Sequence, residues 1–154
     1  MAFRQKITMG TKKKFIKSAE DFCLQNKQRL TKPRIEVLKI ISSSSKPLGA
    51  YEILEKLGNK IKSPKPPTAY RAIDFWMEHG FIHRIESLNA YVVCHADHRH
   101  SGGQFMICDD CGSVVESHIC DLPKPLKDNA AKNTFTPSRW NIEIHGQCER
   151  CHAA

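Results

Sequence analysis

The chain has 154 residues, which is enough for one medium-sized domain or two small ones. Its 24 lysines and arginines against 16 aspartates and glutamates give a formal net charge of +8, which favours a polyanionic partner. No apolar run is long enough to cross a membrane, and the first residues lack the apolar segment of a signal peptide. We therefore expect a cytoplasmic protein, in which seven cysteines indicate metal or redox chemistry rather than disulfides.

The N-terminal segment is polar and is followed by a helical pattern. Residues 1–14, which end in three lysines, predict a flexible basic arm. The apolar residues that then fall on one helical face are Phe15, Ala19, Phe22 and Cys23. Because Cys23 has no partner at ligand spacing, we expect a buried core thiol there rather than a metal ligand.

Two more helices are expected between residues 31 and 58. Thr31 and Pro33 are typical of a helix start, and the serine run at residues 42–45 ends that helix. The next helix begins near Ala50, carries apolar residues at helical spacing, and stops at Gly58.

A further helix and a hairpin complete the first half. The helix opens at Pro67 and closes at Gly80, and two strands over residues 81–86 and 90–94 follow it. The polar side chains left outside its apolar face are Thr68, Tyr70, Arg71 and Asp74. This order of elements predicts a winged helix, in which the last helix reads DNA.

The chemistry of that helix suits the major groove. A helix N-terminus presents the positive end of its dipole to phosphate. Arg71 can form two hydrogen bonds to guanine, and Tyr70 can contact a phosphate or a thymine methyl group. The alternative is a plain helical domain in which Arg71 is simply solvated.

Two cysteine pairs lie in the second half. They are Cys108-Asp-Asp-Cys111 and Cys148-Glu-Arg-Cys151. A tight knuckle lets both sulfurs of a pair face one tetrahedral ion, so the two pairs predict a structural zinc site with four cysteine ligands. Four thiolates leave no open coordination position, and such an ion does no chemistry. The alternative, a redox dithiol, calls for one reactive motif rather than two matched ones.

Folded elements are expected between the two pairs. Glu116 lies on the strand that follows the first knuckle, and a short helix is predicted around Leu126. Ile142 and Ile144 alternate as a strand that leads to the second knuckle.

Further metal donors surround the junction of the two halves. They are His83, Cys94, His95, Asp97, His98, His100, Glu116 and His118. One thiolate, one carboxylate and two neutral imidazoles around Zn²⁺ give a net charge of zero, which avoids the cost of burying charge. A thiolate in the set favours zinc over manganese or ferrous iron. The alternative is that these side chains are ordinary polar loop residues.

Several segments together resemble the ferric uptake regulator (Fur) superfamily and, within it, the zinc uptake regulator branch. The matching segments are residues 29–34, 50–54, 66–75, 80–83, 91–94, 108–112 and 145–151. The resemblance implies an α+β chain with a winged-helix DNA-binding domain over residues 1–94 and an α/β dimerisation domain over residues 95–154. It also implies a homodimer that binds inverted-repeat operator DNA when a sensing site holds metal.

The resemblance assigns roles residue by residue. It places the structural zinc on Cys108, Cys111, Cys148 and Cys151. The sensing zinc falls on His83, Cys94, His100 and Glu116, so that each chain holds two zinc ions. The DNA-contacting positions are Tyr51 and Arg71, with Thr68 and Tyr70 nearby.

Two features separate the chain from other family members. The loop between Cys94 and Cys108 differs slightly in length, which leaves His98 as an alternative to His100. Iron sensors of the superfamily usually have a carboxylate where Cys94 stands, which favours zinc here. A third metal site of some members is not clearly recoverable, although His95 and Asp97 are candidates for it.

We therefore expect a zinc-responsive repressor of zinc uptake and homeostasis genes, with no enzymatic activity and no small-molecule substrate. The alternative within the superfamily is an iron- or peroxide-sensing regulator. A zinc hydrolase or deaminase with Glu116 as general base is a third hypothesis. It calls for a His-x-Glu or His-Glu-x-x-His arrangement, which the sequence lacks.

Overall fold

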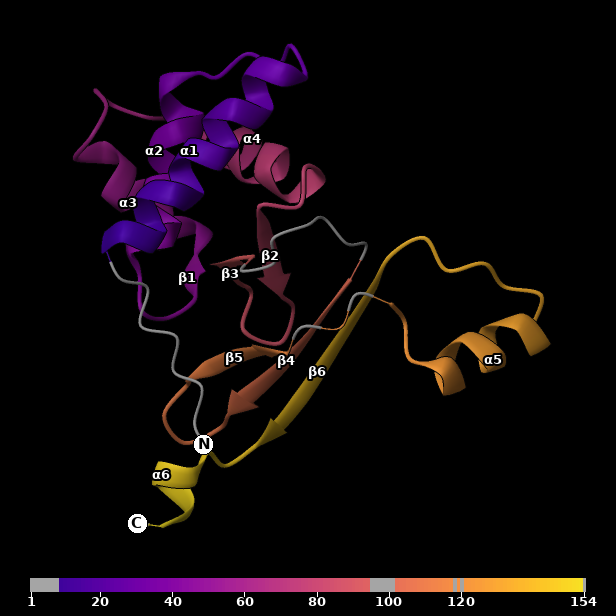
Figure 1. Ribbon diagram of the computed structural model, residues 1–154. Helices are drawn as coiled ribbons and strands as arrows, with labels where there is room; N and C mark the ends of the chain where they lie inside the picture. Colours follow the sequence, from indigo (N-terminus) through magenta and orange to yellow (C-terminus); the bar gives the residue numbers. More distant parts are fainter. Residues whose placement is uncertain (1–8, 95–101, 118, 120, 154) are drawn as a thin grey trace. The chain divides into compact units, whose positions relative to one another are not determined.

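The computed structural model describes residues 9–94, 102–117, 119 and 121–153 (Figure 1). The chain divides into two compact units, an N-terminal unit up to Cys94 and a C-terminal unit after it. The candidate ligands His95, Asp97, His98, His100 and His118 lie outside the described residues. Among the described residues, none of the helices combines the length and the apolar character needed to cross a membrane.

The N-terminal unit consists of helices and a small antiparallel sheet. Its elements are α1 (Met9–Gln25), α2 (Lys32–Ser43), β1 (Leu48–Gly49), α3 (Ala50–Gly58), α4 (Pro66–Glu78), β2 (Ile82–Ile85) and β3 (Ala90–Val93). The strand order is β1-β3-β2. Helices followed by the β2–β3 hairpin confirm the winged helix that the sequence predicts.

The helix boundaries follow from local chemistry. Thr31 caps α2 by accepting a hydrogen bond from the backbone amide of Arg34 at 3.5 Å, and a proline stands in the first turn. The Glu52 carboxylate accepts a hydrogen bond from the Gly49 amide at 2.9 Å and so closes the start of α3. Gly80 has a φ of +71° just after α4, a backbone conformation that favours glycine, and it turns the chain into β2.

One correction concerns the predicted basic arm. The sequence indicates a flexible segment up to residue 14, whereas α1 already begins at Met9. The three lysines at 12–14 therefore belong to the helix. Lysine is a good helix former, and an exposed lysine run shows no apolar periodicity that would reveal a helix.

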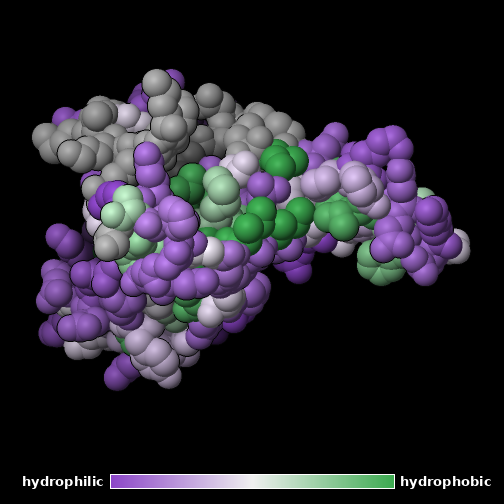
Figure 2. All heavy atoms as spheres, turned by 90° about the horizontal axis from the view of Figure 1, so that it is seen from below, coloured by the Kyte–Doolittle hydropathy of each residue, from purple (hydrophilic) through white to green (hydrophobic). Residues whose placement is uncertain are grey.

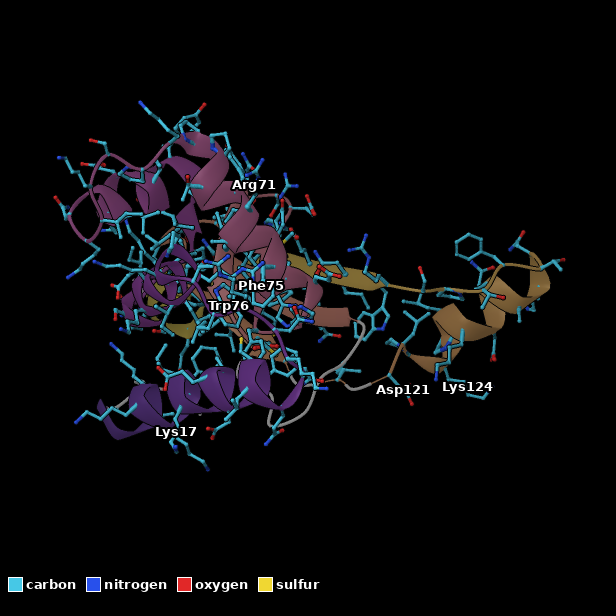
Figure 3. The ribbon with its side chains drawn as sticks, turned by 90° about the horizontal axis from the view of Figure 1, so that it is seen from above. Lys17, Arg71, Phe75, Trp76, Asp121 and Lys124 are labelled. Carbon is cyan, nitrogen blue, oxygen red and sulfur yellow. The ribbon has the colours of Figure 1, made fainter. Side chains whose placement is uncertain are left out.

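A continuous apolar core holds the N-terminal unit together. Trp76 is fully buried, and its Nε1 donates a hydrogen bond to the carbonyl oxygen of Arg34 at 2.7 Å, which ties α4 to α2. Figure 3 shows Phe75 and Trp76 on the inner side of α4, with Arg71 directed outward. Cys23 is 2% exposed within this core, which agrees with a structural role for its thiol. Each fully buried large apolar side chain contributes about 1.5–3 kcal/mol.

The C-terminal unit is a three-stranded sheet with two short helices. Its described elements are β4 (Gly102–Cys108), β5 (Val114–Ser117), α5 (Lys124–Lys132), β6 (Trp140–Gly146) and α6 (Glu149–His152). The strand order is β5-β4-β6, with β5 antiparallel and β6 parallel to the central β4. Together with the N-terminal unit, this sheet confirms the predicted α+β class.

A close contact between two strands fixes the start of this sheet. Gly102 on β4 pairs with Trp140 on β6. A Cβ atom at Gly102 would lie 2.2 Å from the Trp140 ring, so only glycine leaves room for the indole.

Candidate metal centres and nucleic-acid surface

The four cysteines of the two predicted knuckles come together in the C-terminal unit. Their sulfur atoms all lie within 4.8 Å of one another. Cys108 ends β4 and Cys111 lies in the turn after it, while Cys148 caps α6 and Cys151 lies within that helix. The parallel pairing of β4 and β6 delivers both knuckles to the same end of the sheet.

Backbone hydrogen bonds shape each knuckle. The Gly112 amide donates to the Cys108 carbonyl oxygen at 2.9 Å, with Gly112 at a φ of +67°. The Cys151 amide donates to the Cys148 carbonyl oxygen at 3.0 Å. The Cys148 amide lies 3.3 Å from the sulfur of Cys108 and links the two knuckles. An amide that points at a sulfur favours the thiolate form of that sulfur.

The protonation of the cluster depends on a cation. Hydrogen bonding from Ser113 lowers the pKa of the Cys111 thiol to about 6, and the backbone amide of Cys151 lowers the pKa of Cys148. A hydrogen bond with Cys148 raises the pKa of Cys151 to about 12. The raised pKa of Cys151 therefore opposes a fourth thiolate when no cation is bound. A divalent ion releases the remaining protons.

The geometry fits a tetrahedral zinc ion. Zinc–sulfur bonds of about 2.3 Å place the sulfurs of a tetrahedral site about 3.8 Å apart. The sulfurs of Cys111 and Cys148 are 3.8 Å apart. The four donors are all sulfur, which suits zinc and leaves no position for a substrate.

A second pair of donors lies on the wing of the N-terminal unit. His83 is on β2 and Cys94 directly follows β3. Their candidate ligand atoms lie within 4.8 Å of each other. The Cys94 amide donates to the Phe81 carbonyl oxygen at 2.9 Å, which extends the hairpin and fixes the position of Cys94.

Glu116, the third described residue of the predicted sensing set, belongs to the C-terminal unit. It lies on β5, is half-buried, and pairs with Phe105 across the sheet. The antiparallel pairing with β4 fixes its direction at the edge of the sheet.

The predicted DNA-contacting residues lie on α3 and α4. Tyr51 on α3 is 78% exposed, which is unusual for a large aromatic side chain, and Tyr70 on α4 is 42% exposed. Arg71 is exposed as well, whereas Thr68 is half-buried in the first turn of α4. Exposed lysines flank the start of this helix at positions 60, 62 and 65.

Arg34 supports α4 in a way that the sequence alone does not reveal. Its guanidinium carbon lies 3.6 Å from the centre of the Phe75 ring, and the side chain also donates to the Arg29 carbonyl oxygen. This stacked cation joins α2 to the helix that carries Arg71. The sequence points to Arg34 only by placing it in residues 29–34, one of the segments that resemble the superfamily. That resemblance does not identify the contact with Phe75.

Comparisons with known proteins relate the chain to the ferric uptake regulator family. The model of the ferric uptake regulator family matches residues 25–145. The zinc uptake regulation protein of Escherichia coli K12 is 39% identical over 143 residues, covering 92% of this chain and 83% of that protein.

Solved structures extend the likeness to three dimensions. A zinc uptake regulator complexed with zinc and DNA matches with a TM-score of 0.86 and 38% identity, over 93% of this chain and 96% of that one. The holo form of XcZur matches with a TM-score of 0.81 and 39% identity, over 92% of this chain and 99% of that one.

Proposed function

The chain belongs to the ferric uptake regulator family, and we propose that within this family it is a zinc-responsive repressor that binds operator DNA. The observation that carries the proposal is the pairing of a winged helix with a four-cysteine cluster of zinc-site geometry. The likeness to a zinc uptake regulator complexed with zinc and DNA supports both halves of it. In this role the protein works in the cytoplasm and controls zinc uptake and homeostasis genes.

The winged helix is the DNA-binding half. Arg71 on the exposed side of α4 reads guanine in the major groove, and Tyr51 and Tyr70 add contacts at the groove edge. The lysines around the start of α4 contact phosphates and supply affinity that does not depend on sequence. Thr68, half-buried in the first turn, is the weaker candidate.

The first zinc ion is structural. Cys108, Cys111, Cys148 and Cys151 hold it, and the closed sulfur shell keeps it out of any reaction. Its contribution is to fix the end of the sheet at which β4 and β6 terminate.

The second zinc ion is the signal. We assign it to His83, Cys94 and Glu116 with one histidine from the following loop, His100 or alternatively His98. This donor set neutralises Zn²⁺, and its thiolate disfavours ferrous iron and manganese. Because the ligands come from both units, zinc favours one arrangement of the winged helix relative to the C-terminal sheet, and that arrangement fits DNA. Shifting such an equilibrium from mostly open to mostly closed requires about 5.5 kcal/mol of differential zinc affinity.

The active form is a homodimer on an inverted repeat. Val115, Met106 and Ile144 lie opposite one another on neighbouring strands of the C-terminal sheet. Met106 and Ile144 are 45% and 47% exposed, and Figure 2 shows hydrophobic side chains running along this sheet toward α5. A contiguous apolar face of this kind suits a second copy of the chain.

The test is operator binding by metal-stripped protein titrated with zinc, ferrous iron or manganese. Zinc is expected to restore binding at the lowest free concentration. Cys94→Ser is expected to remove the zinc response, while the structural site keeps its metal. If Cys94→Ser still bound DNA in a zinc-dependent way, the assignment of the sensing site would be wrong. If iron restored binding and zinc did not, the iron-sensing alternative would replace this proposal.

Arg71 provides the matching test of DNA reading. Arg71→Ala is expected to weaken operator binding by about 1–3 kcal/mol and to relax the base preference. Lys62→Ala, the control on the same surface, is expected to weaken binding to all sequences alike and to reduce the salt dependence. A loss of base preference in the lysine variant alone would contradict these roles.

A further inference from the structure

Two side-chain bridges connect the cysteine knuckles of the C-terminal unit. The two residues between Cys108 and Cys111 are Asp109 and Asp110. His145 Nδ1 lies 2.9 Å from Asp109 Oδ1, and Gln147 Nε2 donates a hydrogen bond to Asp110 Oδ2 at 2.9 Å. The spacer residues of the first knuckle thus hold the chain segment that leads into the second.

A backbone hydrogen bond lies between the two bridges. The Asp109 amide donates to the Gly146 carbonyl oxygen at 2.8 Å and prolongs the pairing of β4 with β6 past the end of the strand. Residues 109 and 110 and residues 145–147 therefore form a short zipper. This zipper ends where Cys148 begins the second knuckle.

Electrostatics alone gives no reason for aspartates at these positions. Zinc with four thiolates carries a net charge of −2, and two nearby carboxylates add to the negative charge. The bridges to His145 and Gln147 are attractive contacts that offset this repulsion.

We propose that Asp109 and Asp110 are positioning residues that slow the loss of zinc from the four-cysteine site. This inference rests on the structural zinc site proposed above. When one zinc–sulfur bond opens, the zipper keeps the second cysteine pair beside the first, so the bond reforms before the ion leaves. Residues that orient metal ligands through hydrogen bonds commonly alter metal affinity by about 10–100-fold.

The bridge between Asp110 and Gln147 offers the cleaner experiment. Gln147 carries no charge, and its replacement leaves the charge of the site unchanged. His145 is less suitable, because its Nε2 also lies 3.9 Å from Glu143 Oε2. The experiment therefore changes Asp110 and Gln147 singly and together.

The measurement is the rate at which the full-length chain loses cobalt to an excess of chelator. Cobalt(II) replaces zinc, and the visible d–d bands of a four-sulfur site separate it from a site with a single thiolate. Asp110→Ala and Gln147→Ala are each expected to speed the loss by about 10-fold. The double variant is expected to match the faster single variant, because both changes break the same bond. Asp110→Asn keeps an acceptor for Gln147 and is expected to stay close to the parent rate.

Glu149→Ala is the matched control. Glu149 stands inside the second cysteine pair, and among the described residues no hydrogen bond joins its carboxylate to the first knuckle. This variant removes one negative charge beside the ion without removing a bridge. Its rate of cobalt loss is expected to equal or fall below that of the parent.

Two results would overturn the positioning role. One is a rate for Asp110→Ala equal to that of Glu149→Ala, and the other is a double variant whose two effects multiply. If Asp110→Ala takes up no cobalt and Asp110→Asn does, the loss of the bridge has abolished metal binding. This is the expected effect in its strongest form. Absence of four-sulfur bands in the parent chain would instead remove the proposed zinc site itself, which is a different failure.

Discussion

The N-terminal unit buries a continuous apolar core, whereas the buried residues described in the C-terminal unit come from one strand. Its core cluster takes large side chains from several elements, among them Leu38 of α2, Ile53 of α3 and Trp76 of α4. Among the described residues of the C-terminal unit, the buried apolar side chains are Phe105, Ile107 and Cys108 of β4. Burial of apolar surface can stabilise the first unit, but the second needs additional support. A zinc ion and a second copy of the chain can provide that support.

The largest expected effect comes from removing the zinc ion that we propose at the four-cysteine cluster. Cys108→Ser, or chelation of the bound ion, is expected to unfold the C-terminal unit and to leave the N-terminal unit folded. Structural zinc in small domains contributes about 10–16 kcal/mol, which matches or exceeds the total stability of a typical domain. Hydrogen exchange would show lost protection in β4 and β6 and retained protection in α2 and α4. Retained protection in the metal-free C-terminal sheet would contradict the claim that this unit needs the metal in order to fold.

The next largest effect is expected from a substitution in the core of the N-terminal unit. Trp76→Ala removes a fully buried ring and its hydrogen bond to the Arg34 carbonyl oxygen. It is expected to lower the free energy of unfolding of this unit by about 3–5 kcal/mol. Urea unfolding followed by circular dichroism measures the change. Leu24→Ala is the control, because Leu24 is 81% exposed and its truncation is expected to cost less than about 0.5 kcal/mol.

A smaller effect is expected from removing the stacking contact between Arg34 and α4. Arg34→Met keeps the length of the side chain but removes the guanidinium from the face of Phe75. The free energy of unfolding is expected to fall by about 0.5–2 kcal/mol. Arg34→Lys keeps the charge and loses the planar stacking, so it is expected to restore only part of the loss. Full recovery by lysine would show that charge, rather than stacking, provides the support.

The smallest expected effect lies on α5, which has no buried residue. Lys124 Nζ and Asp128 Oδ2 are 2.7 Å apart, but the two side chains are 83% and 53% exposed. Figure 3 shows Lys124 on this helix near Asp121, which pairs with Lys127. Asp128→Asn is expected to change the thermal stability of the C-terminal unit by less than about 0.5 kcal/mol. A change above about 1 kcal/mol would mean that α5 carries more of the fold than its burial indicates.

The sequence predicts the parts of the fold that depend on local chemistry. Thr31 with Pro33 and the glycine at position 80 mark helix ends because their effects act within one turn. The cysteine pairs are equally local, since each knuckle spans four residues. The grouping of Cys108 with Cys148 then follows from the coordination number of zinc.

The rest depends on contacts between distant residues. Strand β1 has two residues, which is too short for any periodicity, and exists through its pairing with β3. The parallel pairing of β4 with β6 joins segments separated by a strand and a helix. For the same reason the sequence reveals neither the stacking of Arg34 on Phe75 nor the bridge from Asp110 to Gln147.

The parallel course of β4 and β6 has a mechanical consequence. Both strands lead into the four-cysteine cluster, so the zinc ion proposed there would close residues 112–147 into a ring. The entropy of closing such a ring grows only slowly with its length. Residues inserted near Thr134, in the exposed stretch between α5 and β6, would therefore lengthen the ring without moving the sulfur atoms. Reporter or affinity segments could be inserted there without disturbing the four cysteines at the end of the sheet.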